Sequence, residues 1–333
     1  MSAQQLEIWN FVCRFGEDGV LLDHYEDLVE PAFLGGHERR WGETRYLLHA
    51  VQYINAGSAK KPLPALAGRI VKDTVIHQQQ KLVAGELVPA DGSLPSAPSS
   101  LFVLLLTNHR LLFVREHQGS PDARQFASTI ERFVRTERTK FVQRKHKEAK
   151  EAGETVTKSF LQRSIALPEV TVTPVLMPSA VEQFVQQFAR IRSVIVEIAP
   201  TNDEPDNEEF FRVLRATGHA IGAKRSRVEY VAPPKEGLDS ATTLQQVKAA
   251  QNGQATFKIS GEDKAGNRLT GDNEQLRVRV PLASDNEELS QRASDAADQY
   301  RELVEAGSIS SGGGEARQHA TILGLAARLF RSR

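Results

Sequence analysis

Residues 255–282, ATFKISGEDKAGNRLTGDNEQLRVRVPL, guide the interpretation of the whole chain because two of their segments alternate apolar and polar side chains. The segments are ATFKIS (255–260) and LRVRV (276–280). Successive side chains of a β-strand point to opposite faces of a sheet, so this period of two predicts two strands that share an apolar face. The opposite face of both strands is predicted to be cationic.

Glycines between the two segments predict where the chain turns. The best reversal is Ala265-Gly266-Asn267, because Gly and Asn tolerate a positive φ angle. The cations of the predicted hairpin face are Lys258, Lys264, Arg268, Arg277 and Arg279. Two interpretations are open. The cations belong to an ordinary solvated sheet face, or they form a rigid surface that contacts a phosphate backbone.

Length and charge limit the possible classes of protein. The chain has 333 residues, 40% of them hydrophobic, which is enough for two domains with a core each. Lys plus Arg and Asp plus Glu both number 42, so the chain is not basic overall. Binding to nucleic acid would therefore have to come from local cationic patches.

The compartment is predicted from three features. The single cysteine, Cys13, lies in an apolar run, which excludes internal disulfides and indicates a core residue. The longest apolar run, residues 101–106, is far shorter than the roughly 18 residues of a membrane span. The first residues, MSAQQLEIWNFVC, lack the basic start of a signal peptide. We expect a soluble protein in the cytoplasm of a bacterial host.

The first half of the chain predicts a mixed α and β domain. Residues 101–106 and 111–116 read as two central strands buried on both faces, because neither alternates cleanly. The other elements expected here are a strand at 6–15, a helix at 44–54, a strand at 69–76 and an exposed connector at 91–100.

A helix with a basic second half is predicted after Ser120-Pro121, a pair typical of helix starts. Its cations between residues 132 and 150 are Arg132, Arg135, Arg138, Lys140, Arg144, Lys145, Lys147 and Lys150. A solubilising exposed helix explains this run. A second phosphate-binding surface explains it equally well.

The second half of the chain predicts another α+β unit from residue 160. Strands are expected at 171–175 and 193–199 and around Arg225 and Arg227. Helices are expected at 179–191, 208–216 and 241–251. A fourth helix is expected to begin at a capping box formed by Ser284 and Glu287 and to run to residue 306. Residues 308–333 read as a Gly/Ser linker and an amphipathic tail.

The predicted fold class is therefore α+β with two domains, 1–159 and 160–307. Each is expected to contain a mixed or antiparallel sheet with packed helices.

Motifs for catalysis are weak. The chain has no P-loop, no G-x-G-x-x-G, no H-E-x-x-H and no cysteine pair. Ser58 to Lys61 and Ser284-Asp285-Asn286 match two elements of penicillin-recognising enzymes, but K-T-G is missing. We predict no catalytic residue and no cofactor. One alternative stays open, because acids of the predicted turns could hold a divalent metal in a nuclease. They are Glu262, Asp263, Asp272 and Glu274.

The last third of the chain resembles the RexA family of prophage exclusion proteins. The resemblance lies in residues 193–199, in DKAGNRLT (263–270) and in the helix expected from Ser284, with a weaker match at 100–103. It implies a cytoplasmic, sequence-independent DNA-binding homodimer without a catalytic site, which acts with a RexB-like membrane partner in abortive infection.

The sequence thus leads to one functional hypothesis: the protein binds double-stranded DNA through its backbone, independently of sequence. The hairpin cations are expected to carry the contacts, helped by Arg225 and Arg227 and by the helix cations Arg135, Arg138, Arg144, Lys145 and Lys147. The alternatives are a metal-dependent nuclease and a protein-interaction module that does not bind DNA.

Overall fold

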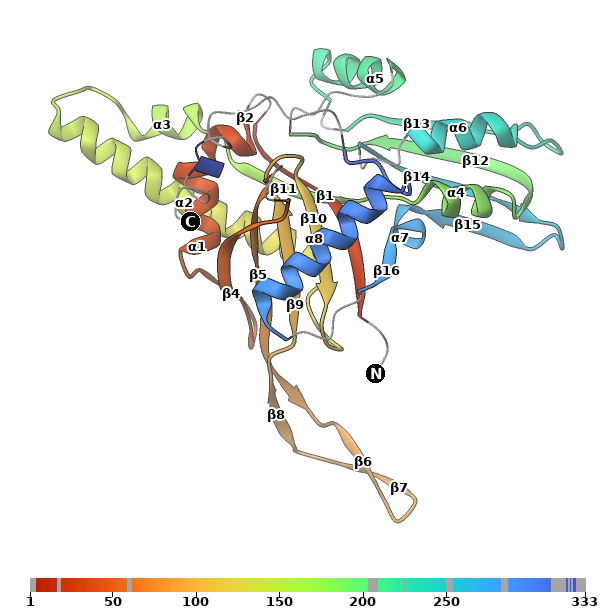
Figure 1. Ribbon diagram of the computed structural model, residues 1–333, viewed down its shortest axis with the longest axis horizontal. Coiled ribbons are helices and arrows are strands. Elements are labelled where there is room, and N and C mark those ends of the chain that lie inside the picture. The colour runs from red at the N-terminus through yellow and green to blue at the C-terminus, as the bar shows by residue number, and fades with distance from the viewer. Residues whose placement is uncertain are drawn as a thin grey trace.

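The computed structural model describes residues 4–327, except for 17–18, 59–61, 203–208, 224, 250–253, 283–286, 313–321, 323 and 325. The fold is α+β, as the sequence predicts, and its centre is a curled antiparallel sheet (Figure 1). No helix of the described residues is long and apolar enough to cross a membrane. The expected capping box at Ser284 lies outside the described residues.

The large sheet has ten strands among the described residues, and seven of them follow the order β11-β1-β10-β9-β5-β4-β3. Strands β16 and β2 also pair with β1, and β8 pairs with β5. Their bounds are β1 (Gln5–Phe15), β2 (Gly19–Val20), β3 (Glu38–Trp41), β4 (Thr44–Asn55), β5 (Pro64–His77), β8 (Ser93–Ser96), β9 (Ser99–Leu105), β10 (Arg110–Arg115), β11 (Pro168–Pro174) and β16 (Arg279–Pro281).

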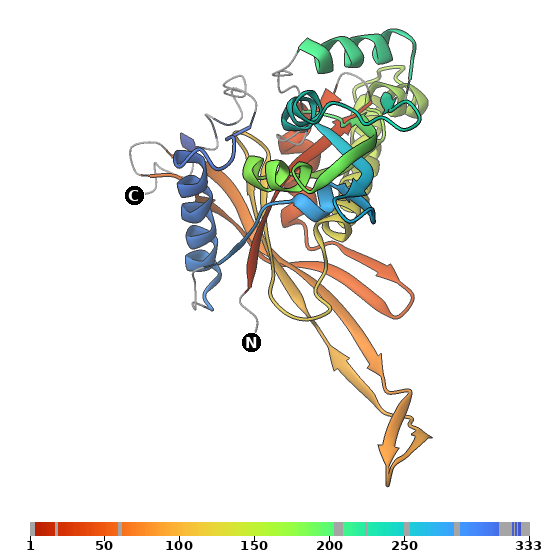
Figure 2. The ribbon, with the colours of Figure 1, turned by 90° about the vertical axis from the view of Figure 1, so that its right-hand side faces the viewer.

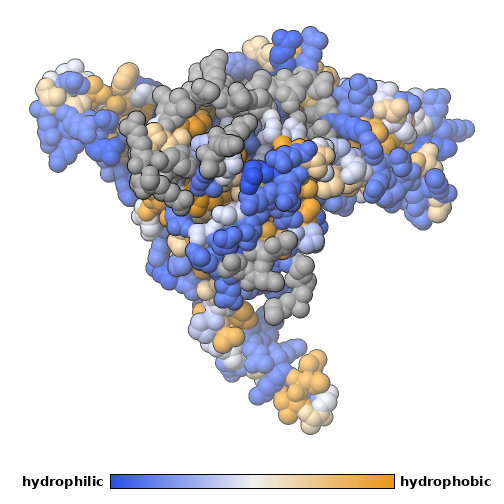
Figure 3. Space-filling view, viewed as in Figure 1, coloured by the Kyte–Doolittle hydropathy of each residue, from blue (hydrophilic) through white to orange (hydrophobic). Residues whose placement is uncertain are grey.

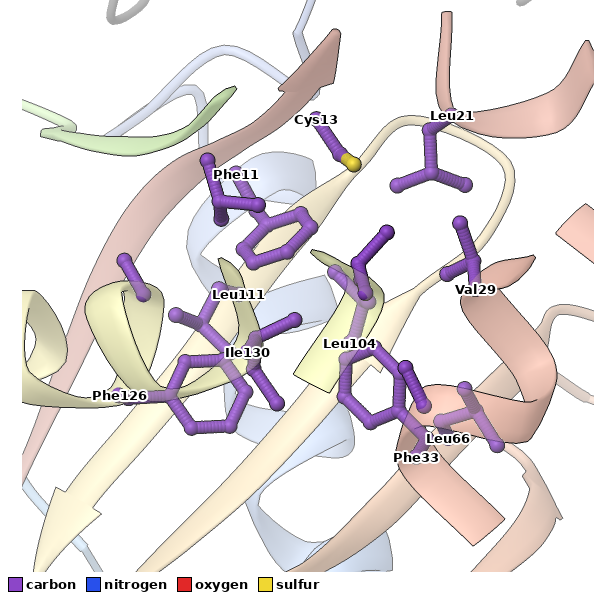
Figure 4. Close-up of a cluster of buried hydrophobic side chains, with 14 of the residues drawn as sticks. Phe11, Cys13, Leu21, Val29, Phe33, Leu66, Leu104, Leu111, Phe126 and Ile130 are labelled. Atoms are coloured by element: carbon purple, nitrogen blue, oxygen red, sulfur yellow. The ribbon is translucent and has the colours of Figure 1, made fainter. Parts of the chain in front are cut away.

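Helices cover both faces of the large sheet. On one face lie α1 (Glu30–Leu34) and α2 (Ala123–Glu151), with α3 (Lys158–Ser164) packed on α2, and on the other face lies α8 (Leu289–Glu305). Phe102 of β9 packs against Phe126 of α2, with ring centroids 4.8 Å apart, while Val103 of β9 belongs to the cluster that includes residues of α8. Figure 4 shows Phe126 and Ile130 of α2 beside Leu111 and Phe11 of the sheet. The prediction that β9 and β10 are buried on both faces is confirmed. Cys13 is buried in the same cluster as Phe102 and Phe126, as predicted.

A second, four-stranded sheet has the order β13-β12-β14-β15. Its strands are β12 (Phe188–Ile198), β13 (Arg227–Val231), β14 (Ala255–Asp263) and β15 (Arg268–Asp272). Its helices are α4 (Pro178–Val185), α5 (Glu209–Ala220), α6 (Ser240–Ala249) and the short α7 (Asn273–Leu276). Phe184, Val247 and Phe257 belong to its core cluster, so α4 and α6 cover one face of this small sheet.

The small sheet is inserted into the large one, so the predicted boundary at residue 160 does not follow the sheets. Strand β11 precedes the insertion and β16 follows it, and both pair with β1. The chain leaves and returns at one place, where Leu176 forms a β-bridge with Arg277 and Val278 N–H donates to the Val175 carbonyl at 2.9 Å. The chain therefore forms two structural units. One contains β1 to β11 together with β16 and α8, and the other consists of residues 177–276.

A long arm leaves the large sheet where β5 extends beyond its neighbours (Figures 1 and 2). Strand β8 pairs with the end of β5, and the hairpin of β6 (Gln80–Val83) and β7 (Glu86–Pro89) forms the tip. Figure 3 shows an apolar surface at this tip. The exposed apolar side chains of the arm are Val75, Ile76, Leu82, Val83, Leu87 and Leu94.

Several predicted elements are wrong, and β4 shows why. Residues 44–54 were expected to form a helix, but they pair as a strand with β5 and β3. Ala50 has a φ angle of 52°, and the register to β5 shifts between His49 and Gln52. This bulge interrupts the alternation of apolar residues, so that Leu48 and Val51 fall three positions apart, as they would on a helix.

Three further elements differ from expectation. The connector expected at 91–100 contains β8 and the start of β9. The helix expected at 179–191 ends at Val185, and β12 begins at Phe188. Strand β14 pairs with β15, not with residues 276–280, which lead into the large sheet. Of the predicted tail, Ile322 is buried in the same cluster as Phe102 and Phe126, so the tail reaches the core at this residue.

The two sheets are also joined by Asn202, which is 5% exposed. Its side-chain amide donates to the Phe11 carbonyl at 2.7 Å and accepts from Cys13 N–H at 2.8 Å. The amide thus pairs with the free edge of β1 as a strand would, and it satisfies two buried backbone groups.

We predict that Asn202→Ala lowers the free energy of unfolding by about 3 kcal/mol, because it leaves two buried backbone groups without partners. Denaturant unfolding followed by circular dichroism measures the change. Gln143→Ala on the exposed surface of α2 is the control, with an expected change below about 0.5 kcal/mol. Equal effects in the two variants would contradict the role assigned to Asn202.

Candidate functional site

The face of the small sheet that points away from α4 and α6 carries no buried side chain among its described residues. We call it the open face. By strand register it contains Arg227, Glu229 and Val231 of β13, Arg190, Ser193, Ile195 and Glu197 of β12, Thr256, Lys258, Ser260 and Glu262 of β14, and Arg268, Thr270 and Asp272 of β15. Serines and threonines occupy its centre, and charged residues surround them.

The tight turn between β14 and β15 presents two cations. Gly266 has a φ of 81°, which places the reversal where the sequence predicts it. Asp263 accepts hydrogen bonds from the backbone N–H groups of Asn267 and Ala265, both at 2.8 Å. These hydrogen bonds lower the pKa of Asp263, and the one from the Asn267 backbone has the largest effect. The carboxylate is thus used to hold the turn, while Lys264 and Arg268 remain exposed.

Three predicted cations of the hairpin are available to a ligand. Within the described part of the chain, Lys258, Lys264 and Arg268 have no ion-pair partner, and all three are exposed. Glu262, the acid nearest to Arg268 in the register, pairs instead with Arg192 at 3.0 Å and Arg190 at 3.6 Å. This end of the open face is therefore cationic.

The sequence analysis missed Arg190, which it placed in the helix expected at 179–191, and Arg192, which lies between that helix and the strand expected at 193–199. The alternation of Arg190, Ile191 and Arg192 near the start of β12 could have indicated a strand with both arginines on its outer face. A β-bulge between Ile191 and Ser193 then shifts the register of the strand against β14.

Arg277 and Arg279 do not belong to the hairpin, and this corrects the prediction. Arg277 contacts Glu7 of β1 at 2.9 Å and Glu274 at 3.0 Å, and its guanidinium carbon lies 5.7 Å from the centre of the Trp9 ring. Only 15% of the Arg277 side chain and 10% of the Glu7 side chain are exposed. Arg279 is more exposed and lies 3.5 Å from Glu7. Arg277 therefore serves the packing of the two sheets.

Arg225 and Arg227 lie at the inner end of the open face, next to the large sheet. Both are exposed, and each has an acidic neighbour: Glu197 lies 3.8 Å from Arg225, and Glu229 lies 3.2 Å from Arg227. Surface pairs of this kind contribute little to stability and exchange readily for another anion. These two arginines can therefore contribute to an anionic ligand that also contacts the hairpin.

The basic helix does not share a surface with the hairpin. Figure 1 shows the second half of α2 and the β14–β15 turn at opposite ends of the long axis of the molecule. Arg138 is buried, its pKa is lowered by desolvation, and it donates to the carbonyls of Ile165 and Gln162. It holds α3 on α2, which contradicts its predicted role in DNA binding.

The remaining predicted cations of α2 are exposed but paired. Arg135 contacts Glu131 at 2.7 Å, Lys145 contacts Glu148 at 3.0 Å and Lys147 lies 3.7 Å from Glu151. Arg144 contacts Asp27 at 3.2 Å. These pairs are typical of a solvated helix surface.

The acids proposed for a metal-dependent nuclease have other roles. Asp272 caps α7 by accepting from the N–H groups of Glu274 and Gln275. Glu274 contacts Arg124 and Arg277. Among the residues that the structure describes, no three His, Cys, Asp or Glu side chains are grouped as a metal site.

Comparison with known families gives one match, which covers most of the chain. Residues 16–298 match the model described as "Domain of unknown function (DUF4747)". The chain belongs to this family. The DUF4747 match begins at the residue after β1 and ends within α8, so it includes the inserted small sheet and the described strands of the large sheet other than β1. No curated protein matches the chain.

We predict that Arg277→Ala lowers the free energy of unfolding by about 3 kcal/mol, because the mostly buried Glu7 carboxylate then keeps only the more exposed Arg279, 3.5 Å away, as its partner. Arg279→Ala is the matched control. It removes the same charge from a more exposed site, and we expect a loss below about 1 kcal/mol. Denaturant unfolding of both variants gives the comparison, and a larger loss for Arg279→Ala would contradict the assignment.

Proposed function

We propose that this DUF4747 protein binds double-stranded DNA independently of sequence, with the open face of the small sheet as its interface. The observation that carries the proposal is the set of exposed cations without ion-pair partners among the described residues, Lys258, Lys264 and Arg268, on one rigid hairpin. The hairpin backbone beneath these cations is already ordered, so binding need not order it, which favours contact with a fixed array of phosphates.

The spacing of these cations suits a DNA backbone. Lys258 and Lys264 are six residues apart, or roughly 20 Å along a strand. One DNA strand presents about six phosphates over that distance along the helix axis. Arg225 and Arg227 extend the cationic path toward the large sheet.

The composition of the open face favours contacts to the backbone over contacts to bases. Its described residues include no aromatic ring on which an unpaired base could stack. The central hydroxyls of Ser193, Ser260 and Thr270 can donate to phosphate oxygens. An intact duplex bound without sequence preference is the ligand that this surface fits best.

The resemblance to RexA supports a biological setting for this proposal. Two of the segments that carry it, 193–199 and 263–270, overlap β12 and the β14–β15 hairpin, and both contribute to the open face. We therefore propose that the protein is a DNA sensor in phage or prophage defence. It would act as a homodimer with a RexB-like membrane protein and without a catalytic site.

One observation favours a second candidate, a protein-interaction module. The arm exposes Leu82 and Leu87 side by side at 69% each, and Leu94 is 65% exposed. Contiguous apolar side chains on a soluble surface mark contact sites for other macromolecules. Absence of DNA binding together with a partner bound at the arm would favour this candidate.

We predict that DNA affinity falls about 10²–10³-fold between 50 and 200 mM salt, because about five phosphate contacts release their counterions. The fall should be the same for unrelated duplexes. The double variant Lys264→Glu with Arg268→Glu should weaken binding at least 10-fold and make the salt dependence shallower. Gel-shift titrations at the two salt concentrations measure both effects.

Lys145→Glu with Lys147→Glu is the control, because it reverses two charges at the other end of the molecule (Figure 1). We expect it to leave DNA affinity within about twofold, since surface charges this distant are screened. If the helix variant loses binding and the hairpin variant keeps it, the interface is α2. If magnesium or manganese leads to cleavage of the bound plasmid, the protein is a nuclease.

A further inference from the structure

The arm formed by the end of β5, by β8 and by the β6–β7 hairpin concentrates exposed apolar side chains (Figures 2 and 3). Among the described residues, fourteen large apolar side chains are exposed, and six of them lie between Val75 and Leu94. The arm is a two-stranded ribbon, and a ribbon of this kind is marginally stable in water unless one of its faces is covered. The arm is therefore built as a contact surface.

Two cross-strand pairs supply most of this apolar surface. Ile76 lies opposite Leu94 where the arm begins, and Leu82 lies opposite Leu87 near its end. We call them the inner pair and the tip pair. The exposed fractions are 54% and 65% in the inner pair and 69% for both leucines of the tip pair. The four side chains together present roughly 500 Å² of apolar surface, an area typical of functional patches on soluble proteins.

Both pairs lie on the same face of the ribbon. Their members on the first strand are six residues apart, and an even spacing keeps two side chains on one face. Their members on the second strand are seven residues apart, but one residue of that strand, Asp91, has no counterpart on the first. Backbone hydrogen bonds on either side of it join Gly92 to Gln78 at 2.7 Å and Ala90 to Gln79 at 3.2 Å. This bulge restores the common face.

The large sheet continues this face beyond the base of the arm. Thr74 of β5 precedes Ile76 by two residues, and its hydroxyl forms a hydrogen bond with that of Thr44 in β4 at 2.8 Å. Thr44 lies opposite Trp41 of β3, which is 72% exposed. Side chains that lie opposite one another in a sheet share a face, so Trp41 is on the same side of the molecule as the two apolar pairs.

We propose that this face binds the same face of a second copy of the chain, with the two arms packed antiparallel about a two-fold axis at Gln79. On the first strand of the ribbon, each apolar pair lies three residues from Gln79, or about 10 Å. A two-fold rotation therefore brings the tip pair of one copy onto the inner pair of the other, twice. Contact between identical, self-complementary surfaces gives a closed dimer.

The area of this contact is sufficient for a dimer. Two arms would bury about 1,000 Å² in total, which is the area that a specific interface requires. The tip of the second copy also ends beside Thr74, about two strand spacings, or roughly 10 Å, from Trp41. The exposed indole ring would thereby gain a partner and add to the buried area.

The charges of the arm favour a second copy over other occupants. Residues 74–96 contain one lysine, Lys81, and two acids, Glu86 and Asp91. Nucleic acids and anionic membranes are attracted by clusters of cations, which this segment lacks. Glu86 lies opposite Val83 next to the turn, so insertion of the tip into lipid would bury a carboxylate.

Sedimentation velocity of the full chain without DNA tests the proposal. We expect a dimer whose fraction rises with concentration up to about 100 µM. Leu82→Glu with Leu87→Glu should weaken dimerisation about 10-fold or more, because carboxylates then face apolar side chains. Both leucines are exposed in the single chain, so Tm should not fall. Leu167→Glu, at a site that is 60% exposed next to β11, is the matched control and should change dimerisation less than about twofold.

A mixture of two variants tests the antiparallel arrangement. One chain carries Leu82→Glu with Leu87→Glu, and the other carries Ile76→Lys with Leu94→Lys. Each alone should be monomeric where the unaltered chain is dimeric, because a charged pair meets an apolar pair in both halves of the interface. In the mixture, one half joins Glu to Lys and the other half stays apolar, so heterodimers should form about 10-fold more readily than either homodimer.

Three results would overturn the proposal. The first is a monomer at 100 µM, whether or not it sediments with phosphatidylcholine vesicles through the tip leucines, which would indicate a membrane site. The second is a dimer that the tip variant does not weaken, and the third is a mixture that forms no heterodimer. The interface would supply the contact for the homodimer proposed above, but it needs no DNA, so these results are separate from those of the gel shifts.

Discussion

The mostly buried ion pair between Glu7 and Arg277 fixes how the two sheets lie against each other. Glu7 belongs to the strand on which the large sheet is built, and Arg277 is the first residue after the inserted unit. Trp9 covers the guanidinium, so little water reaches the pair. An ion pair with low exposure tolerates almost no displacement, because any shift leaves a charge without its partner. Asn202 adds a second attachment at the other edge of β1. These two contacts hold the inserted unit, and with it the open face, against the large sheet.

The sequence predicts elements well where one local pattern determines the structure. Strands β1, β9 and β10 and helix α2 were found because long apolar runs or a sustained helical period leave few alternatives. Strand β4 was not found, because a bulge at Ala50 breaks its alternation and produces a spacing that also fits a helix. The insertion was not found either. Strand β16 pairs with β1 across more than 270 residues, and nothing in the composition of either segment identifies the other as its partner.

The candidate site shows the same limit at the scale of side chains. Alternation correctly predicted the outward direction of Lys258 and the turn that exposes Lys264 and Arg268. It gave Arg277 the same role, because a period of two identifies a face but not the sheet to which that face belongs. Charge density alone was also misleading on α2, where Arg138 lies inside the fold.

The insertion of the small sheet has a consequence for the order in which the chain folds during synthesis. Strands β1, β9 and β10 leave the ribosome early, but β16 and α8, which complete the same body, come after residue 276. Until then, the face of the large sheet that α8 covers stays open to water, with Ile8, Val103 and Leu112 uncovered. The inserted unit has its own core and brings its two ends together, so it can fold during this interval. Its early folding would bring residue 277 next to β1 and shorten the search by which the last helix finds the unfinished sheet.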